Sequence, residues 1–576
     1  MKFPSLRNKT QIPDIRAVPN WFVILGRLDA SNYDVTYSCE EFFVVNAEAV
    51  KSKNGRFIIV GDVWLSNRSQ LLQNLHSNKE YTDQELVAHL WEIKGKECLN
   101  LLEGMFSLCV WDNSQREVYL ARDGVGCRTI YYSSYGKSCA IAPRLATLLP
   151  FHTRQLDLVA LRDYLCCAFV PGEQTLWQNV RELSVGMVLQ MESSGETINY
   201  VSQKLFWEPR EDIQNAEESL IWHGKQLRTL LDRVVQESLP VDAVGVYLSG
   251  GLDSSCMTAL AAKFHNHPVH TYSIHFGENC PSELEFSGLV AQHCKTQHHI
   301  LEITASDMWD KLPLTMSYLD DPIGDPLTVP NYLLGKIARQ DIYTVLNGEG
   351  GDPCFGGPKN QPMLLERLYG GVNHTEKNLV TNYVNSFKKC SSDLPQLLKP
   401  EIFAAVKDKP FVFANYLHGE ESYLNRLMTI NIKFKGADHI LTKVNNLTVA
   451  NELEGRSPLF DRRIVEMAMQ IPPQYKLAGA QEKAVLKQAV LDVLPREIIE
   501  RPKSGMMVPV QYWFRHLWQR RAKSLLLNRN AEIAPYLNQD LIKQWLNYRG
   551  DAWQRYGVKL WLLVSLEIWL QVQKGR

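Results

Sequence analysis

A short apolar run that stops at two glycines constrains the fold of this chain more than any other feature. Segment 244–255 reads VGVYLSGGLDSS, in which strand-like residues end at Ser249 and a helix-like stretch follows Gly250 and Gly251. Strand, tight turn and helix in this order build a parallel sheet, which binds ligands where its strands end. Glycines let backbone N–H groups approach an anion at the start of a helix, and the Ser254 hydroxyl can add a donor. The segment therefore predicts an anion-binding loop.

Asp253 indicates which anion this loop binds. A loop for γ-phosphoryl transfer carries Gly-Lys-Ser/Thr, whereas here an aspartate follows the glycine turn. Its carboxylate would repel phosphates unless a divalent cation lay between them, so Asp253 is expected to bind Mg²⁺. This arrangement suits pyrophosphate that leaves after attack at the α-phosphate of ATP. A glycine turn with a helix-capping aspartate is the alternative without a ligand.

A second acidic loop supports the first. Segment 341–357, DIYTVLNGEGGDPCFGG, is another strand that runs into a glycine-rich turn, with Glu349 and Asp352 inside it. In the same sheet, Asp352 would reach the cation that Asp253 binds, and two acids on two loops can hold Mg²⁺ against both phosphate groups. Glu349 would then face the reaction centre and could deprotonate an amine. A solvated loop acid is the alternative interpretation of Glu349.

The strand and helix patterns divide the chain into two halves. Residues 20–205 contain short β-branched and aromatic runs, with one helix expected over 82–104 that Thr82 caps. Beyond the polar segment 206–219, helices alternate with strands expected at 243–249, 268–276, 298–303 and 341–348, and after about residue 360 the pattern is mostly helical. We therefore predict an α+β domain at 1–205, a linker at 206–219 and an α/β domain with a helical extension at 220–576.

Composition excludes several classes of protein. A net charge of −1 over 576 residues argues against a nucleic-acid partner. The 12 cysteines include no CxxC pair, so most are expected to be reduced thiols in a cytoplasmic protein. The start lacks the apolar core of a secretory signal. The apolar stretch 559–572 is short and interrupted by Glu567, so a buried helix is expected there. No membrane association is predicted.

Five motifs, in order, resemble the asparagine synthetase family over nearly the whole chain. The two loops are similar to its pyrophosphate loop and its GEGxDE loop. Segment 282–303 is similar to the region between its second and third strands, 451–463 to a helix junction, and 494–514 to its "LP…R-x-K-x-G" segment. Segments 99–112 and 118–133 resemble its glutaminase domain.

This resemblance implies an Ntn-hydrolase-like β-sandwich followed by a PP-loop domain of the adenine-nucleotide α-hydrolase type. It implies that ATP adenylates a carboxylate and that an amine then displaces AMP. Asp253 and Asp352 would bind Mg²⁺, while Glu349 and Lys503 would be catalytic, Lys503 by stabilising developing charge. The residues implied in binding ATP or pyrophosphate are Leu248, Ser249, Gly250, Gly251, Asp253, Ser254, Ser273, Gly348 and Lys483.

The N-terminal half departs from the family at its nucleophile. The family's glutaminase uses a cysteine at position 2, but this chain has Lys2 there and its first cysteine is Cys39. The asparagine–glycine pair of the family's oxyanion strand is altered, with Gly61-Asp62 in its place. Because lysine does not replace a thiol nucleophile at neutral pH, we predict a glutaminase-inactive domain.

The second loop departs too, because Pro353 stands where the family carries an acid, close to the expected carboxylate substrate. Glutaminase-inactive relatives include β-lactam synthetases, which carry a tyrosine at the position of Glu349, and lasso-peptide cyclases. We therefore favour a small-molecule or peptide carboxylate and amine, with a precursor peptide and a maturation protease as candidate partners. Asparagine formation from free ammonia, a tRNA-thiolating enzyme and a non-catalytic ATP-binding regulator are the alternatives.

Overall fold

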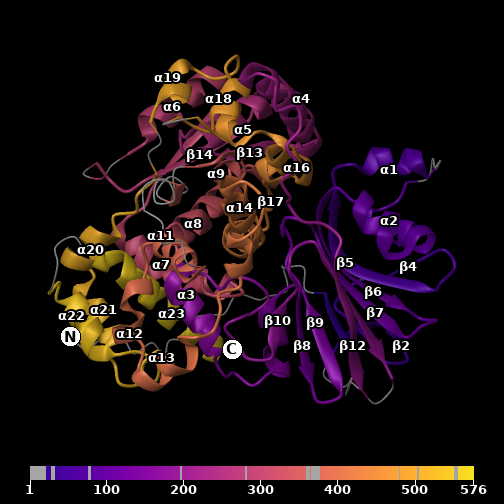
Figure 1. The fold of residues 1–576 in the computed structure, drawn as a ribbon, viewed down its shortest axis with the longest axis horizontal. Helices are drawn as coiled ribbons and strands as arrows, with labels where there is room; N and C mark the ends of the chain where they lie inside the picture. The colour runs from indigo at the N-terminus through magenta and orange to yellow at the C-terminus, as the bar shows by residue number, and fades with distance from the viewer. Residues whose placement is uncertain are drawn as a thin grey trace.

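The structure is a computed structural model in which an antiparallel half and a parallel half share one core (Figure 1). It describes residues 21–26, 33–75, 80–194, 197–278, 280, 282–357, 363–364, 376–478, 481–502, 505–549 and 555–575. Lys2 and Lys503, two residues singled out from the sequence, lie outside these ranges.

The N-terminal half is a sandwich of two six-stranded antiparallel sheets, as predicted. The first has the order β10-β8-β9-β1-β3-β2, with bounds Val180–Glu182, Tyr131–Tyr135, Ser138–Ala142, Phe22–Leu25, Phe42–Val45 and Val35–Cys39. The second has the order β12-β11-β7-β6-β5-β4, with bounds Ile198–Leu205, Met187–Ser193, Glu117–Arg122, Gly104–Asp112, Phe57–Leu65 and Val50–Lys51. Alternating side chains fill the space between them, where Phe42 stacks on Trp111 at 5.4 Å.

Helices α1 (Arg68–Asn74) and α2 (Asp83–Lys94) cover the second sheet (Figure 1). Thr82 and Glu85 form the capping box that their spacing indicates. The single helix expected over 82–104 is wrong, because α2 ends at Lys94. Its cap Gly95 has a positive φ of 58°, and a 3₁₀ helix (Gly95–Leu101) follows.

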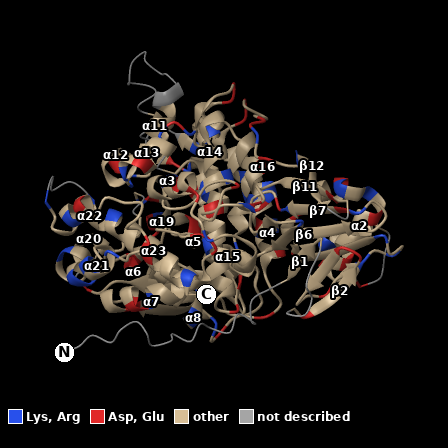
Figure 2. Cartoon of the chain, turned by 90° about the horizontal axis from the view of Figure 1, so that it is seen from below, with Lys and Arg blue, Asp and Glu red and all other residues tan. Residues whose placement is uncertain are grey.

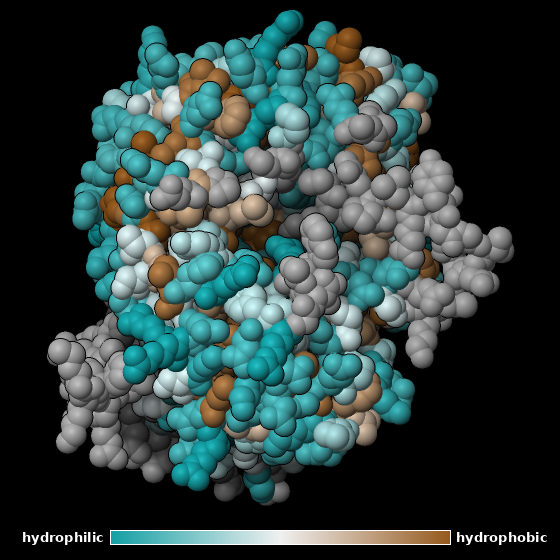
Figure 3. All heavy atoms as spheres, turned by 90° about the vertical axis from the view of Figure 1, so that its left-hand side faces the viewer, coloured by the Kyte–Doolittle hydropathy of each residue, from teal (hydrophilic) through white to brown (hydrophobic). Residues whose placement is uncertain are grey.

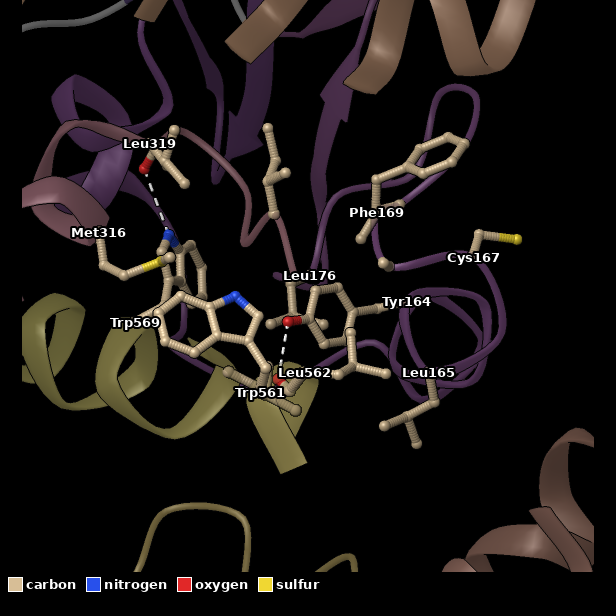
Figure 4. Packing of buried hydrophobic residues seen from close by; sticks show 14 of the residues in the cluster. Tyr164, Leu165, Cys167, Phe169, Leu176, Met316, Leu319, Trp561, Leu562 and Trp569 are labelled. Carbon is tan, nitrogen blue, oxygen red and sulfur yellow. Dashed lines mark hydrogen bonds between the residues drawn. The ribbon is translucent and has the colours of Figure 1, made fainter. Parts of the chain in front are cut away.

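The first sheet packs through α3 (Leu158–Cys167) on the C-terminal helix α23 (Tyr556–Lys574). Figure 4 shows the Tyr164 hydroxyl donating to the carbonyl of Leu562 at 2.9 Å and the Trp569 indole donating to the carbonyl of Leu319 at 3.2 Å. Trp569 also stacks on Trp177 of the N-terminal half. The apolar C-terminal segment therefore joins the two halves, and no described helix is long and apolar enough to cross a membrane.

The C-terminal half contains a five-stranded parallel sheet of order β15-β14-β13-β16-β17. Its strands are Gln297–Glu302, His270–His275, Val244–Tyr247, Thr344–Leu346 and Glu454–Arg456. The sequence predicted the first four. The edge strand β17 was missed, because it has three residues in a segment read as a helix junction. The expected linker 206–219 contains no helix or strand, and α4 (Leu220–Ser238) follows it.

Helices surround this sheet, and the described chain also has a short two-stranded sheet of β18 (Leu477–Ala478) and β19 (Gln481–Glu482). The helices from β13 to residue 357 are α5 (Leu252–Phe264), α6 (Leu284–Cys294), α7 (Ala305–Tyr318), α8 (Thr328–Ala338) and α9 (Gly351–Phe355). Beyond residue 360 the described part has α11 (Glu376–Ser386), α12 (Leu394–Leu397), α13 (Pro400–Val406), α14 (Tyr423–Ile430), a π-helix (Asn431–Leu441), α15 (Thr442–Val449), α16 (Arg462–Gln470), α17 (Pro473–Lys476), α18 (Ala484–Ala489), α19 (Arg496–Glu500), α20 (Val510–His516), α21 (Gln519–Leu526) and α22 (Gln539–Leu546). A mostly helical C-terminal region is thus confirmed.

The distribution of charged residues agrees with the net charge of −1. Basic and acidic residues are interspersed over the described elements (Figure 2), and the face in Figure 3 is mostly hydrophilic, with hydrophobic residues in small patches.

We expect Trp569→Ala to lower the free energy of unfolding by about 3–5 kcal/mol, because the substitution leaves a cavity between the two halves. Lys574→Ala, which removes an exposed ion pair on the same helix, should change it by less than about 1 kcal/mol. Urea unfolding followed by tryptophan fluorescence measures both, and equal losses would contradict the role of Trp569.

Candidate functional site

The two loops predicted from the sequence lie side by side at the carboxyl ends of β13 and β16. These strands pair in parallel, with Val246 opposite Leu346. A Cβ atom on Gly348 would overlap the backbone of Ser254, and one on Gly351 would overlap the carboxylate of Asp253. The loops therefore interlock through glycines, and a side chain at either position would push the two acids apart.

Lys483 holds the two predicted metal ligands together. Its ammonium lies 2.5 Å from Asp253 Oδ2 and 2.5 Å from Asp352 Oδ1. Burial by itself would lower the pKa of Lys483, but the two carboxylates raise it well above its usual value. The structure thus brings together Asp253, Asp352 and Lys483, which were inferred from three separate segments.

The donors at this point suit a Mg²⁺ ion. Asp253 Oδ1 is buried and has no hydrogen-bond partner, while its other oxygen pairs with Lys483. Mg²⁺ prefers carboxylate oxygens and is commonly bound by one or two of them together with substrate phosphates. Asp253 and Asp352 would hold such an ion, with Lys483 as a second cation beside it.

The first loop is closed by its own serines. The Ser249 amide donates to Ser254 Oγ at 3.1 Å, and the Gly251 amide donates to Ser249 Oγ at 3.3 Å. Gly250 has a φ of 76°, which accounts for the glycine in this turn. The buried Ser273 hydroxyl donates to the carbonyl of Leu248 at 2.5 Å and supports the end of the strand. Helix α5 begins at Leu252, directly after the two glycines.

Glu349 points from the second loop into the same cavity. Its amide donates to Asn347 Oδ1 at 3.0 Å, which also accepts from the Ser457 hydroxyl at 3.0 Å. Burial raises the pKa of Glu349, and the nearby carboxylates of Asp325, Asp352 and Asp253 raise it further. A carboxylate with a raised pKa accepts a proton more readily. Asn347 was missed in the sequence, although it directly precedes the glycine-rich turn.

The sequence did not reveal the residues that form the cavity wall opposite Glu349. This wall is formed by Asp325, before α8, together with His439 of the π-helix and Lys443 of α15. Asp325 Oδ2 lies 2.7 Å from Lys443 Nζ and 3.4 Å from His439 Nε2. Burial lowers the pKa of His439 to about 4, so the imidazole is neutral at pH 7. The only sequence signal was an acid in a Gly-Asp-Pro turn, because the other two residues stand in an ordinary helical pattern.

The N-terminal half holds this wall in place. The amide of Gly172 donates to Asp438 Oδ2 at 2.7 Å, and the buried Arg122 guanidinium lies 3.8 Å from the same carboxyl group. Phe169 stacks on His439 with ring centroids 5.3 Å apart. π-helical segments often occur at functional sites, and this one faces the cavity on one side and the sandwich on the other.

The walls enclose a cavity of about 440 Å³. Most predicted residues line it: Leu248, Ser249, Gly251, Asp253, Ser254, Ser273, Gly348, Glu349, Asp352 and Lys483. Gly250 does not, but its carbonyl accepts from Arg501 at 2.9 Å, which ties the segment before Lys503 to the loop. Arg501 also pairs with Glu283 at 2.9 Å. It was quoted within a motif but not singled out.

Comparisons with known proteins agree with this arrangement. The family model described as Asparagine synthase matches residues 226–571, and the Glutamine amidotransferase domain model matches residues 47–207. Glutamine-hydrolyzing asparagine synthetase 1 of Bacillus subtilis (strain 168) is 25% identical over 551 residues, which cover 89% of this chain and 84% of the relative. A protein of Mycobacterium bovis named "Putative asparagine synthetase [glutamine-hydrolyzing]" is 28% identical over 467 residues, which cover 74% of this chain and 70% of the relative.

Among solved structures, the glutamine phosphoribosylpyrophosphate amidotransferase of B. subtilis shares 11% identity at a TM-score of 0.23, over 64% of this chain and 87% of that chain. The family models cover both halves and match the observed sandwich and parallel sheet. The chain therefore belongs to the asparagine synthase family, with a glutamine amidotransferase-type domain followed by a PP-loop synthetase domain.

Proposed function

We propose that this carbon–nitrogen ligase adenylates a carboxylate with ATP, releases pyrophosphate, and joins the acyl group to an amine without hydrolysing glutamine. One observation carries the proposal: Asp253, Asp352, Lys483 and Glu349 converge on one cavity from interlocked loops. At these strand ends, the carboxylates suit Mg²⁺ and a reacting amine, and the positive group suits pyrophosphate, so all three could bind in one place.

Each group has a proposed task. Asp253 and Asp352 would hold Mg²⁺, which neutralises phosphate charge when bound. The first loop, at the start of α5, would bind pyrophosphate through backbone N–H groups and the serine hydroxyls. Lys483 would balance the same charge. Lys503 stays a proposed cation for the developing negative charge, since it follows Arg501 in a segment tied to the loop.

Glu349 is proposed as the general base toward the amine. Its raised pKa favours proton uptake, and neutral His439 beside the Asp325–Lys443 pair gives the opposite wall a polar surface for the acyl substrate. Pro353 lines the cavity where relatives carry an acid. This substitution supports a substrate other than aspartate, either a small acid or a peptide, with a precursor peptide and protease as partners.

Several features of the N-terminal half support the loss of glutaminase activity. Burial raises the pKa of the Cys98 and Cys139 thiols to about 12, and raises that of Cys109 and Cys127 well above the usual value. A thiol nucleophile acts as the thiolate, so these buried groups are inert. At the altered oxyanion strand, Asp62 is paired with Arg128 at 2.8 Å.

ATP–pyrophosphate exchange across a panel of acids, including free and peptide carboxylates, tests the proposal. Exchange with a peptide acid would support the peptide substrate. Exchange with aspartate, together with asparagine formation from ammonium, would favour the alternative that the names of the relatives suggest. Exchange with no acid in the panel would contradict adenylation and leave a regulatory ATP-binding protein.

We expect Asp253→Asn and Asp352→Asn each to reduce exchange at least about 100-fold, because each removes a charge that faces the phosphates. Asp242→Asn, at an exposed position beyond the other end of β13, should leave exchange unchanged. Circular dichroism checks that all three variants fold. Full exchange in Asp253→Asn would show that the assignment of this residue is wrong.

Glu349→Gln should separate the two steps. Amide formation is expected to fall about 100-fold or more, because the amine loses its base, while exchange persists. Single-turnover product formation and exchange are measured on the same preparation, with Glu302→Gln as a control on an exposed strand end. Equal loss of both activities would assign Glu349 to adenylation instead.

The protein should release no glutamate from glutamine above the no-enzyme background, and ammonium or another amine should be required for product. A coupled glutamate dehydrogenase assay with excess glutamine measures this release. Glutamate formed at the rate of amide synthesis would overturn the assignment of an inactive domain.

A further inference from the structure

Three side chains with metal-binding groups meet at the amino end of the parallel sheet, opposite the end that carries the cavity. His270 opens β14, His299 lies in β15, and Asp341 precedes β16. One nitrogen of each histidine and one carboxylate oxygen lie within 4.8 Å of one another. The atoms His270 Nδ1 and His299 Nε2 are 3.2 Å apart, and His299 Nε2 is 3.8 Å from Asp341 Oδ2.

The sheet itself builds this cluster. Tyr272 stands opposite His299 in the β14–β15 register, and their rings stack with centroids 4.9 Å apart. The Tyr272 hydroxyl donates to Asp341 Oδ2 at 3.2 Å. It reaches across β13 because Gly245 lacks a side chain, and a Cβ atom there would overlap the Tyr272 ring. Asp341 is therefore oriented by a second residue, as metal-binding carboxylates commonly are.

The distances suit a small divalent ion. Zinc–nitrogen bonds of about 2.0–2.1 Å in a tetrahedral site place two nitrogens about 3.3 Å apart, close to the observed separation. Asp341 Oδ2, which lies within 4.8 Å of both histidine nitrogens, would move toward them, and the stacked imidazole rings would rotate so that both lone pairs meet the ion. Burial lowers the pKa of His270; Asp341 opposes this effect and His299 adds to it, and the net lowering favours the neutral imidazole that binds a metal.

We propose that His270, His299 and Asp341 bind a divalent transition-metal ion of the zinc type, with water at the remaining positions. The two imidazole nitrogens select such metals over Mg²⁺, which prefers oxygen ligands. The side chains of His299 and Asp341 are 35% and 33% exposed, so an ion can enter from solvent. The ion would link β14, β15 and the start of β16, and would stabilise the sheet on which the proposed active site stands.

Cobalt serves as the spectroscopic probe for this site. The full chain is treated with EDTA, dialysed and titrated with Co²⁺ alone, and the d–d absorption of histidine-bound cobalt is followed. We expect one equivalent of this band in the wild type, bound at least 10-fold more tightly than in His270→Ala/His299→Ala, and its loss on adding Zn²⁺. Zn²⁺ should also raise the melting temperature of the wild type but not that of the double variant.

Matched variants make the result specific. His267→Ala, an exposed histidine three residues upstream, should keep the band. Asp253→Asn should keep it too, which separates this site from cation binding in the cavity. His299→Gln is a milder change that should also weaken cobalt binding, and it tests the proposal if the double variant does not fold. Absence of the band in the wild type, or an unchanged band in His299→Gln and the double variant, would overturn the proposal.

Discussion

The contact of one lysine with two aspartates determines how the synthetase half is built. Lys483 reaches Asp253 and Asp352 from a segment outside the parallel sheet, at 2.5 Å from each. Without this cation, two carboxylates at the ends of neighbouring strands would repel each other. Glycines then let the loops approach closely enough for the contact to form. The strand order β13-β16, the two glycine turns and the start of α18 therefore depend on one another.

The N-terminal half supports the synthetase cavity, a role that does not depend on glutaminase activity. Gly172 and Arg122 hold Asp438, and Phe169 packs on His439, so the wall opposite Glu349 rests on the sandwich. Helix α23 adds a second connection through Trp569 and Leu562 (Figure 4). A domain that no longer hydrolyses glutamine would therefore still be retained, because its removal would expose the π-helix and a large part of the shared core.

Much of the fold follows from local patterns in the sequence. The strands around 244–247 and 344–346, the capping box at Thr82 and the buried C-terminal helix all have local signals that the structure confirms. The places where these predictions were wrong also have local causes. Gly95 ended α2 early through its left-handed conformation, and β17 was too short for its alternation to be visible.

Some residues of the candidate site could likewise be recognised in the sequence, and others could not. Glycines and acids at strand ends can be recognised in the sequence, because a parallel sheet brings such ends to one edge. Asp253, Glu349 and Asp352 could therefore be identified from the sequence alone. His439 and Lys443 could not, since a buried charged residue on a helix has the same sequence pattern as an exposed one, and Asp325 stands in a turn that looks like any other Gly-Asp-Pro turn. Whether Lys483 faced solvent or the two aspartates, and whether His270, His299 and Asp341 met, depended on strand order and on packing across Gly245. The sequence determined the elements and the chemistry at their ends, while the tertiary structure decided which charges share a low-dielectric space.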